Sequence, residues 1–274
     1  MQAKHRSVWS NQGRKIRKNY FDLGVCTGLG NYYGDIVPTF FSFQQLHPDM
    51  GIFARYNVGQ YLAFRTTAIY GAISGDDKYY NNKARNLSFR SNIEEFGLTM
   101  EINLMPYHAF NRRKSGFAPY VFFGIAGFHF NPKAEYNGTW YELQPLGTEG
   151  EGLAGYAPKY STFGISLPIG GGLKYRLETS YNNYITIGAE FGIRKTFTDY
   201  LDDVSRTQYV SLDSLGKGSM SANLSWREDE YFGYKKGTFF PDIRRGNPDN
   251  KDWYYFGNIT VSYVFGNKRI SFEH

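Results

Sequence analysis

The stretch "FGLTMEINL", residues 96–104, alternates strictly between large apolar side chains and polar or small ones. A period of two places the two sets on opposite faces of a β-strand. Glu101 belongs to the polar set, so one face of this strand needs an apolar environment while the other must accommodate a charge. The apolar set consists of Phe96, Leu98, Met100, Ile102 and Leu104.

Two later stretches repeat this alternation, "FGISLPIGGGLKYRL" at 163–177 and "ITIGAEFGI" at 185–193. Strands of a soluble sandwich usually have about 5–6 residues, whereas a tilted strand needs about 9–11 residues to cross a bilayer. The length of the strands therefore favours a membrane protein, while the polar face suits either a soluble sandwich with that face in water or a barrel with lipid outside and a polar lumen inside. The side chains that we expect to face lipid are Leu98, Met100, Ile102, Ile165, Leu167 and Ile187.

Eight candidate strands follow from the same criterion, and the connections between them are alternately short and long along the chain. This alternation is typical of outer-membrane barrels. The sequence therefore predicts an all-β fold, an eight-stranded antiparallel transmembrane β-barrel with long extracellular loops and short periplasmic turns. The candidate strands are 20–29, 50–57, 61–73, 96–104, 118–130, 163–177, 185–193 and 254–265.

The predicted barrel occupies residues 20–266 and crosses the cell outer membrane many times. A basic arm, residues 1–19, and a tail, residues 267–274, are both expected on the periplasmic side. The first twenty residues have no apolar stretch of the kind that a signal peptide needs. We therefore expect either a cytoplasmic protein or a chain without its leader.

The composition agrees with a barrel. Aromatic residues make up 19% of the chain and there are 31 glycines, and aromatic side chains gather near the ends of the candidate strands, as interfacial girdles do. The single cysteine, Cys26, excludes a disulfide framework. Its phase points to the lumen, which leaves two interpretations: a small buried side chain, or a thiol that pairs with another protein.

Charged side chains on the polar faces should fill the barrel. The interior of an eight-stranded barrel is just wide enough for side chains to occupy it, and buried charges require partners. We therefore expect ion pairs rather than an open pore, and prefer this to a role for Glu101 and Glu190 as general acids. The expected network consists of Arg65, Glu101, Arg176, Glu190 and Arg194.

The acidic stretch "TFTDYLDDVS", residues 196–205, begins where the seventh strand ends. Calcium binding and catalysis are two interpretations, but adjacent carboxylates alone do not make a calcium site. We expect instead that Asp199 caps a one-turn helix, because an acidic residue suits that position. The residues predicted to fold the root of this loop are Thr198, Asp199, Asp202 and Asp203.

Basic and amide side chains are concentrated on the predicted periplasmic side, in the arm and the short turns. They predict a surface for a protein partner, with contact to lipid headgroups or solvent alone as the alternative. This candidate partner-binding set is Arg14, Lys15, Arg17, Lys18, Asn57, Gln60, Asn111, Arg112, Arg113, Lys114, Asn182 and Asn183.

Five stretches carry a resemblance to a known family: "NYYGDI" (31–36), "FARYNV" (53–58), "RNLSFRSNIEEF" (85–96), "FHFNPKAEYNGTWYELQPLGTEGEG" (128–152) and "RKTFTDYLDDVS" (194–205). Together they make the chain resemble the PorG-like family of outer-membrane β-barrels. The resemblance implies a component of the type IX secretion system, which also serves gliding motility. It implies partners in a periplasmic ring of the PorK/GldK and PorN/GldN type, and no catalytic residues.

The residues themselves leave a second class of function open, a stand-alone barrel that binds or modifies a ligand at its extracellular rim. His129 lies near the outer end of its strand, but no matching serine and acid accompany it as a triad would require. The five histidines lack metal-ligand spacing, and no phosphate-binding loop is present. We therefore expect no enzyme activity, no metal, no cofactor and no nucleic acid, with outer-membrane lipids as surroundings.

Overall fold

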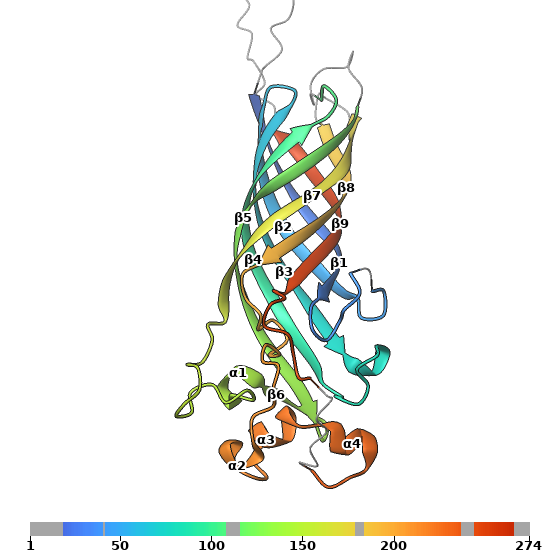
Figure 1. The fold of residues 1–274 in the computed structure, drawn as a ribbon. Helices are drawn as coiled ribbons and strands as arrows, with labels where there is room; N and C mark the ends of the chain where they lie inside the picture. Colours follow the sequence, from blue (N-terminus) through green and yellow to red (C-terminus); the bar gives the residue numbers. More distant parts are fainter. Residues whose placement is uncertain (1–18, 41, 108–115, 179–183, 237–243, 266–274) are drawn as a thin grey trace, which may run out of the picture.

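The structure is a computed structural model that describes residues 19–40, 42–107, 116–178, 184–236 and 244–265. Eight long strands form one closed barrel (Figure 1). Each strand is antiparallel to both of its neighbours, and β4 pairs with β5 to close the sheet. In spatial order the barrel strands are β4 (Ser88–Asn103), β3 (Leu62–Asp76), β2 (His47–Val58), β1 (Asn19–Tyr33), β9 (Trp253–Phe265), β8 (Tyr184–Thr196), β7 (Phe163–Glu178) and β5 (Phe117–Tyr136).

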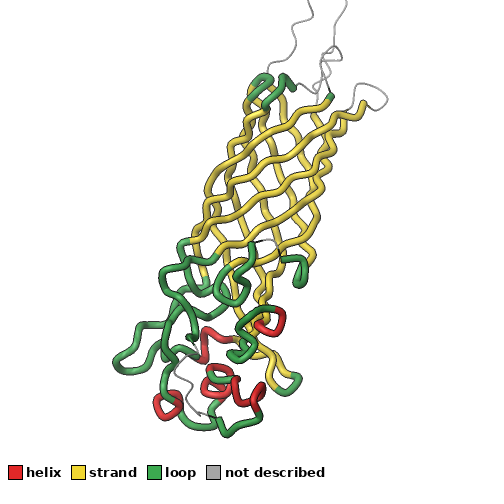
Figure 2. Tube along the Cα trace, turned by 45° about the vertical axis from the view of Figure 1, so that its right-hand side comes forward, coloured by secondary structure: helices red, strands yellow, loops and turns green. Residues whose placement is uncertain are grey.

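This arrangement confirms the predicted eight-stranded antiparallel barrel. The first residue of β1 and the last residue of β9 lie at the end that carries the short turns, here called the turn end (Figure 1). All the helices lie at the opposite, loop end (Figure 2). No helix in the described ranges is long and apolar enough to cross a membrane, a finding that does not bear on spans made of strands.

The strands have an apolar outer surface and a polar interior. Leu98 and Ile165 are 53% and 55% exposed, while Thr99 and Ser166 beside them are buried. All six side chains predicted to face lipid lie in the outward phase of their strands. Towards the loop end the outward positions become polar, as at Glu94 of β4. The apolar belt therefore has a defined edge.

Glycines in the inward phase make room for large aromatic rings. A Cβ atom on Gly170 would lie 2.5 Å from Cζ of Phe122, and one on Gly192 would lie 2.7 Å from the same atom. The Phe122 ring fits inside the barrel because β7 and β8 carry glycines, without side chains, next to it.

A ninth strand, β6 (Thr139–Glu142), was not predicted. It pairs with the end of β5 beyond the barrel, between Lys133 and Tyr136. Asn137 and Gly138 connect the two strands and both have positive φ angles, 50° and 77°. Asn-Gly is the preferred sequence for such a two-residue hairpin turn, so the stretch 131–162, expected as a long loop, begins with a hairpin.

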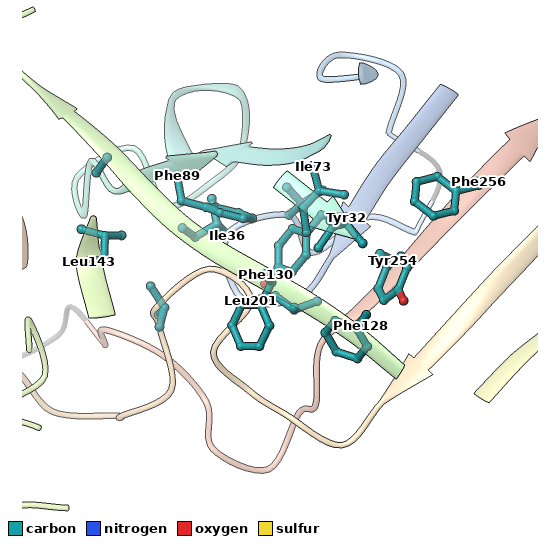
Figure 3. Packing of buried hydrophobic residues seen from close by; sticks show 14 of the residues in the cluster. Tyr32, Ile36, Ile73, Phe89, Phe128, Phe130, Leu143, Leu201, Tyr254 and Phe256 are labelled. Carbon is teal, nitrogen blue, oxygen red and sulfur yellow. The ribbon is translucent and has the colours of Figure 1, made fainter. Parts of the chain in front are cut away.

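The long connections fold together into one structure, here called the loop cap, which comprises the described residues of 34–46, 77–87, 137–162 and 197–252. Its apolar centre continues into the barrel mouth, where Phe128 of β5 packs against Tyr254 of β9 and lies in the same buried cluster as Leu201 (Figure 3). The cap also contains the short helices η1 (Asp77–Tyr79), α1 (Leu143–Leu146), α2 (Leu212–Leu215), α3 (Met220–Ser225) and α4 (Glu228–Phe232).

Candidate functional site

Glu101, on β4, is the centre of a charge network inside the barrel. Its carboxylate lies 3.0 Å from Nε of Arg55, 3.3 Å from Nε of Arg65 and 2.8 Å from Nζ of Lys174. These cations come from β2, β3 and β7, so one carboxylate connects four strands. Its side chain is completely buried, and it binds three cations because a single pair would leave its remaining lone pairs unsatisfied.

The network extends across the lumen from both arginines. Arg55 Nη1 lies 3.0 Å from Asp22, and Arg65 Nη1 lies 2.6 Å from Glu190. Tyr120 donates its hydroxyl to Glu190 at 2.5 Å. The Arg65 guanidinium also lies over the Phe122 ring, 5.1 Å from its centroid. Charge and aromatic surface therefore alternate across the barrel.

A second ion pair lies nearer the loop end. Arg194 Nε is 3.2 Å from Glu95, and Tyr254 donates its hydroxyl to the same carboxylate at 2.7 Å. The guanidinium stands 4.7 Å from the centroid of Phe256. The lumen thus holds four paired acids and four paired bases, Asp22, Glu95, Glu101, Glu190, Arg55, Arg65, Lys174 and Arg194.

The structure brings only part of the predicted set together. Arg65, Glu101 and Glu190 lie in one network, whereas Arg194 pairs with Glu95, and Arg176 lies 5.9 Å from the centroid of Tyr184 near the turn end. Four members lay outside the predicted network, and each follows from the period-two phase along its strand. They are Asp22, Arg55, Glu95 and Lys174.

Cys26 faces the lumen as predicted and is only 4% exposed. The second interpretation, a thiol that pairs with another protein, is therefore wrong, because the barrel wall encloses the sulfur.

The acidic stretch 196–205 has no helix, so the predicted cap of a helix at Asp199 is wrong. The carboxylates instead bind other parts of the cap. Asp199 accepts from the Ser205 hydroxyl at 2.7 Å, and Asp203 accepts from Tyr160 at 2.7 Å and from Thr148. Thr198 accepts from the backbone N–H of Tyr200. These residues do lie at the loop root; Thr198 and Asp199 bind within it, and Asp203 connects it to the connection 137–162.

Asp202 and Asp252 form a buried pair around one tyrosine. The Tyr32 hydroxyl lies 2.6 Å from Asp202 Oδ2 and 2.8 Å from Asp252 Oδ1. Both carboxyls are 1% exposed, and burial raises both pKa values well above their usual range. A hydroxyl has one proton to donate and can serve only one ionised carboxylate, and the raised pKa values favour a proton on the other carboxyl, which can then donate to the Tyr32 oxygen.

Two buried arginines hold the loop cap together. Arg245 pairs with Glu149 at 2.9 Å and donates to the Ser225 carbonyl at 3.0 Å, which joins two long connections. Arg85 binds both oxygens of Asp77, at 2.6 and 2.8 Å, and donates to the carbonyls of Asp35 and Arg245. Arg85 thereby joins three of the four connections.

Two of the predicted partner-binding residues are described, and they differ. Asn57 is 2% exposed and donates to Asp22 at 3.0 Å, so it lies inside the barrel and offers no surface to a partner. Gln60 lies in the β2–β3 turn, where its carbonyl accepts from Asn103 and Tyr107. The others, Arg14, Lys15, Arg17, Lys18, Asn111, Arg112, Arg113, Lys114, Asn182 and Asn183, lie outside the described residues.

His129 faces outward at the edge of the apolar belt. Its Nδ1 lies 3.9 Å from Glu94, beside a groove of about 740 Å³ on the outer wall that Met50, Tyr70 and Phe163 also line. The lining contains no serine. Within the described part of the chain, no three His, Cys, Asp or Glu side chains are arranged to hold a metal ion.

The sequence matches a family model over residues 11–227, and the family is described as a domain of unknown function, DUF6089. The chain belongs to this family. No curated protein matches this DUF6089 chain significantly in sequence.

Among solved structures, the DUF6089 barrel is similar to the attachment invasion locus protein Ail of Yersinia pestis (TM-score 0.41, 8% identity, 91% of this chain and 100% of that one). It is also similar to Neisserial surface protein A (0.42, 8%, 89% and 97%) and to the N-terminal β-barrel domain of Pseudomonas aeruginosa OprF (0.34, 11%, 89% and 97%). These scores and identities are too low to carry an argument about function.

Proposed function

We propose that this barrel is a non-enzymatic outer-membrane component of the type IX protein secretion machinery, which anchors the periplasmic ring of PorK/GldK and PorN/GldN type proteins. The resemblance of five sequence stretches to the PorG-like family supports the proposal. The structural observation that carries it is the charge network in the lumen. Because side chains fill the lumen, the barrel can act on other proteins only at its two ends.

The outer surface supports a position in a membrane. The outward side chains at the middle of the barrel are apolar, and polar side chains such as Arg90 and Glu94 follow towards the loop end. Because the sheet is closed, its backbone groups pair between strands and none is left at an open edge, as a bilayer requires. In this proposal the loop end lies outside the cell and the turn end lies in the periplasm.

The lumen argues against a role as a conduit. Moving a chain or solute past Glu101 and Arg65 would separate buried ion pairs, each of which costs about 3–5 kcal/mol to break. The loop end is covered by its own cap. The turn end remains, where β4 ends and β5 begins, and the sequence that connects these two strands contains Arg112, Arg113 and Lys114. We assign docking of the ring to this end.

A matched pair of charge reversals tests the proposal. Arg112→Glu with Arg113→Glu changes the turn end, and Arg206→Glu with Lys217→Glu makes the same change in charge at the loop end, where both residues are exposed. Each tagged variant is purified from the outer-membrane fraction, and the co-purifying ring proteins are quantified by mass spectrometry. We expect the turn-end variant to lose most of the ring and the loop-end variant to retain it.

The salt dependence of ring binding gives a second test. Exposed charges are screened over about 8–10 Å at 0.1–0.15 M salt, so the difference between the two variants should shrink as the ionic strength of the wash increases. Loss of the ring from the loop-end variant alone, or full retention in both, contradicts docking at the turn end.

A further inference from the structure

A polar pocket of about 450 Å³ opens on the loop cap, at the junction of three connections. It lies far from the turn end and plays no part in the proposed docking of a ring. Its lining comes from 34–46, 77–87 and 197–252, and consists of Asp35, Asn81, Asn82, Ala84, Arg85, Arg244, Gly246 and Asn247.

The floor of the pocket is built by contacts within the cap. Arg85 is buried, and its guanidinium donates four hydrogen bonds, two to the Asp77 carboxylate and one each to the carbonyls of Asp35 and Arg245. The Asp35 carboxylate accepts the backbone N–H of Asn247 at 2.7 Å. A Cβ atom on Gly246 would lie 2.8 Å from that carboxylate, so a larger residue would displace the floor. The pocket therefore exists without a ligand.

The rim of the pocket differs from its floor. Asn81, Asn82 and Arg244 are exposed, and their side chains make no hydrogen bond or ion pair with any described residue. Two amide groups and one guanidinium are thus available beside the Asp35 carboxylate. Ala84 is the largest apolar side chain in the lining, which contains no aromatic or branched aliphatic residue.

The lining contains both hydrogen-bond donors and acceptors, and this mixture selects the chemistry of the ligand. An amide both donates and accepts, a carboxylate accepts and a guanidinium only donates. An anion would meet Asp35 and a cation would meet Arg244, so neither charge alone suits the pocket. Hydroxyl groups donate and accept at once. We propose that the pocket binds a neutral saccharide unit, with Asp35 accepting from a hydroxyl and Arg244 donating to one.

The volume agrees with this ligand, because pockets for small molecules usually measure about 300–1,000 Å³. The Asp35 carboxyl is half-buried, and burial raises its pKa to about 6. A partly desolvated carboxylate gains more from a hydroxyl than an exposed one does, because less water competes for it.

The test uses the full chain folded in lauryldimethylamine oxide, since a detergent with a sugar headgroup would compete. D-glucose, D-galactose and D-mannose are titrated by isothermal calorimetry and by saturation-transfer NMR, with inorganic phosphate and lysine as charged probes. We expect at least one hexose to bind with a Kd of about 1 mM or tighter, and both charged probes to bind at least tenfold more weakly.

Two triple variants separate the pocket from the rest of the surface. Asn81→Ala with Asn82→Ala and Arg244→Gln should weaken hexose binding at least tenfold without changing the unfolding temperature, because all three side chains are exposed. The control combines Asn92→Ala, Arg90→Gln and Lys217→Gln, which are exposed residues outside the pocket lining, and should bind as the unaltered chain does. The proposal is overturned if no hexose binds, if phosphate or lysine binds equally tightly, or if the pocket variant retains the affinity.

Discussion

The barrel lumen and the loop cap both bury charged side chains, but they balance charge in different ways. In the lumen network every acid has a basic partner, four against four, and one further inward-facing acid, Asp49 of β2, is buried without an ion pair to any described residue. In the described part of the cap, eight carboxyl groups and two arginines are buried. The carboxyl groups belong to Asp77, Glu149, Glu151, Asp199, Asp202, Asp203, Glu228 and Asp252, and the arginines are Arg85 and Arg245.

This difference indicates two ways to satisfy buried charge. Ion pairs in the lumen hold fixed charges and need no protons. The cap has too few cations for its acids, so hydroxyl groups, backbone N–H groups and bound protons must serve the remaining ones. The lumen should therefore respond mainly to loss of a partner, and the cap mainly to pH.

The largest effect is expected from Glu101→Gln. The change leaves Arg55, Arg65 and Lys174 within 3.3 Å of a neutral amide, and removing one partner from a buried network costs about 3–5 kcal/mol. Urea unfolding of the barrel in lipid vesicles, followed by its shift in gel mobility, measures the loss.

The matched control for this change is Glu94→Gln, on the outward face of the same strand. Its side chain is 61% exposed, so the change should alter stability by no more than about 0.5 kcal/mol. A loss below about 1 kcal/mol for Glu101→Gln would mean that water screens the lumen charges, and the contrast with the cap would fail.

A second, more local effect is expected from Arg245→Met. The variant leaves Glu149 buried without its cation and removes the bond to the Ser225 carbonyl, so the cap should loosen while the barrel strands stay folded. Limited proteolysis should cut within 137–162 and 197–252 much faster, with an unchanged urea transition of the barrel. Arg206→Met is the control, because Arg206 is exposed. A lowered urea transition would show that cap and barrel unfold as one unit.

The sequence predicts the barrel far better than the cap, and the reason is the range of the interactions. Alternation along 96–104 fixes which face of β4 holds Glu101, and strand order follows from the short turns. The same phase places Arg55 and Lys174 inward, so the whole lumen network could be inferred from single strands. Which acid meets which base depends on strand register, and no pattern within one strand gives that.

In the cap, partners are distant in sequence and follow no period. Tyr32 meets Asp202 across 170 positions and Asp252 across 220. The acids of "TFTDYLDDVS" satisfy the local rules for a helix cap, but Asp199 accepts from the Ser205 hydroxyl and Asp202 from the Val204 N–H and the Tyr32 hydroxyl, and the helix does not form. The Asn137–Gly138 turn was a local signal, but it lay within a segment classed as a loop.

The smallest effect, and the one that separates the two regions most directly, is the pH dependence of the cap. Burial raises the pKa of Asp199 to about 7 and that of Asp203 to about 8, and raises those of Asp202 and Asp252 well above their usual range. The folded cap therefore binds protons that the unfolded cap, with carboxyl pKa values of about 4, releases. This contribution to stability is complete below pH 4 and is lost as pH rises through the raised values.

We therefore expect protease to cut the cap more slowly at pH 5 than at pH 9, and Asp252→Asn to reduce that difference by about half. An amide carries no charge at either pH and still offers an oxygen to the Leu201 N–H that Asp252 binds now at 2.9 Å. It also removes the repulsion from Asp202 across the Tyr32 hydroxyl, so the variant should gain protection at pH 9 and change little at pH 5. Asp249→Asn, at an exposed position, should leave both rates unchanged. If the cap of Asp252→Asn keeps the full pH dependence, the shared proton does not lie between Asp202 and Asp252, and Asp203 with Tyr160 is the next pair to examine.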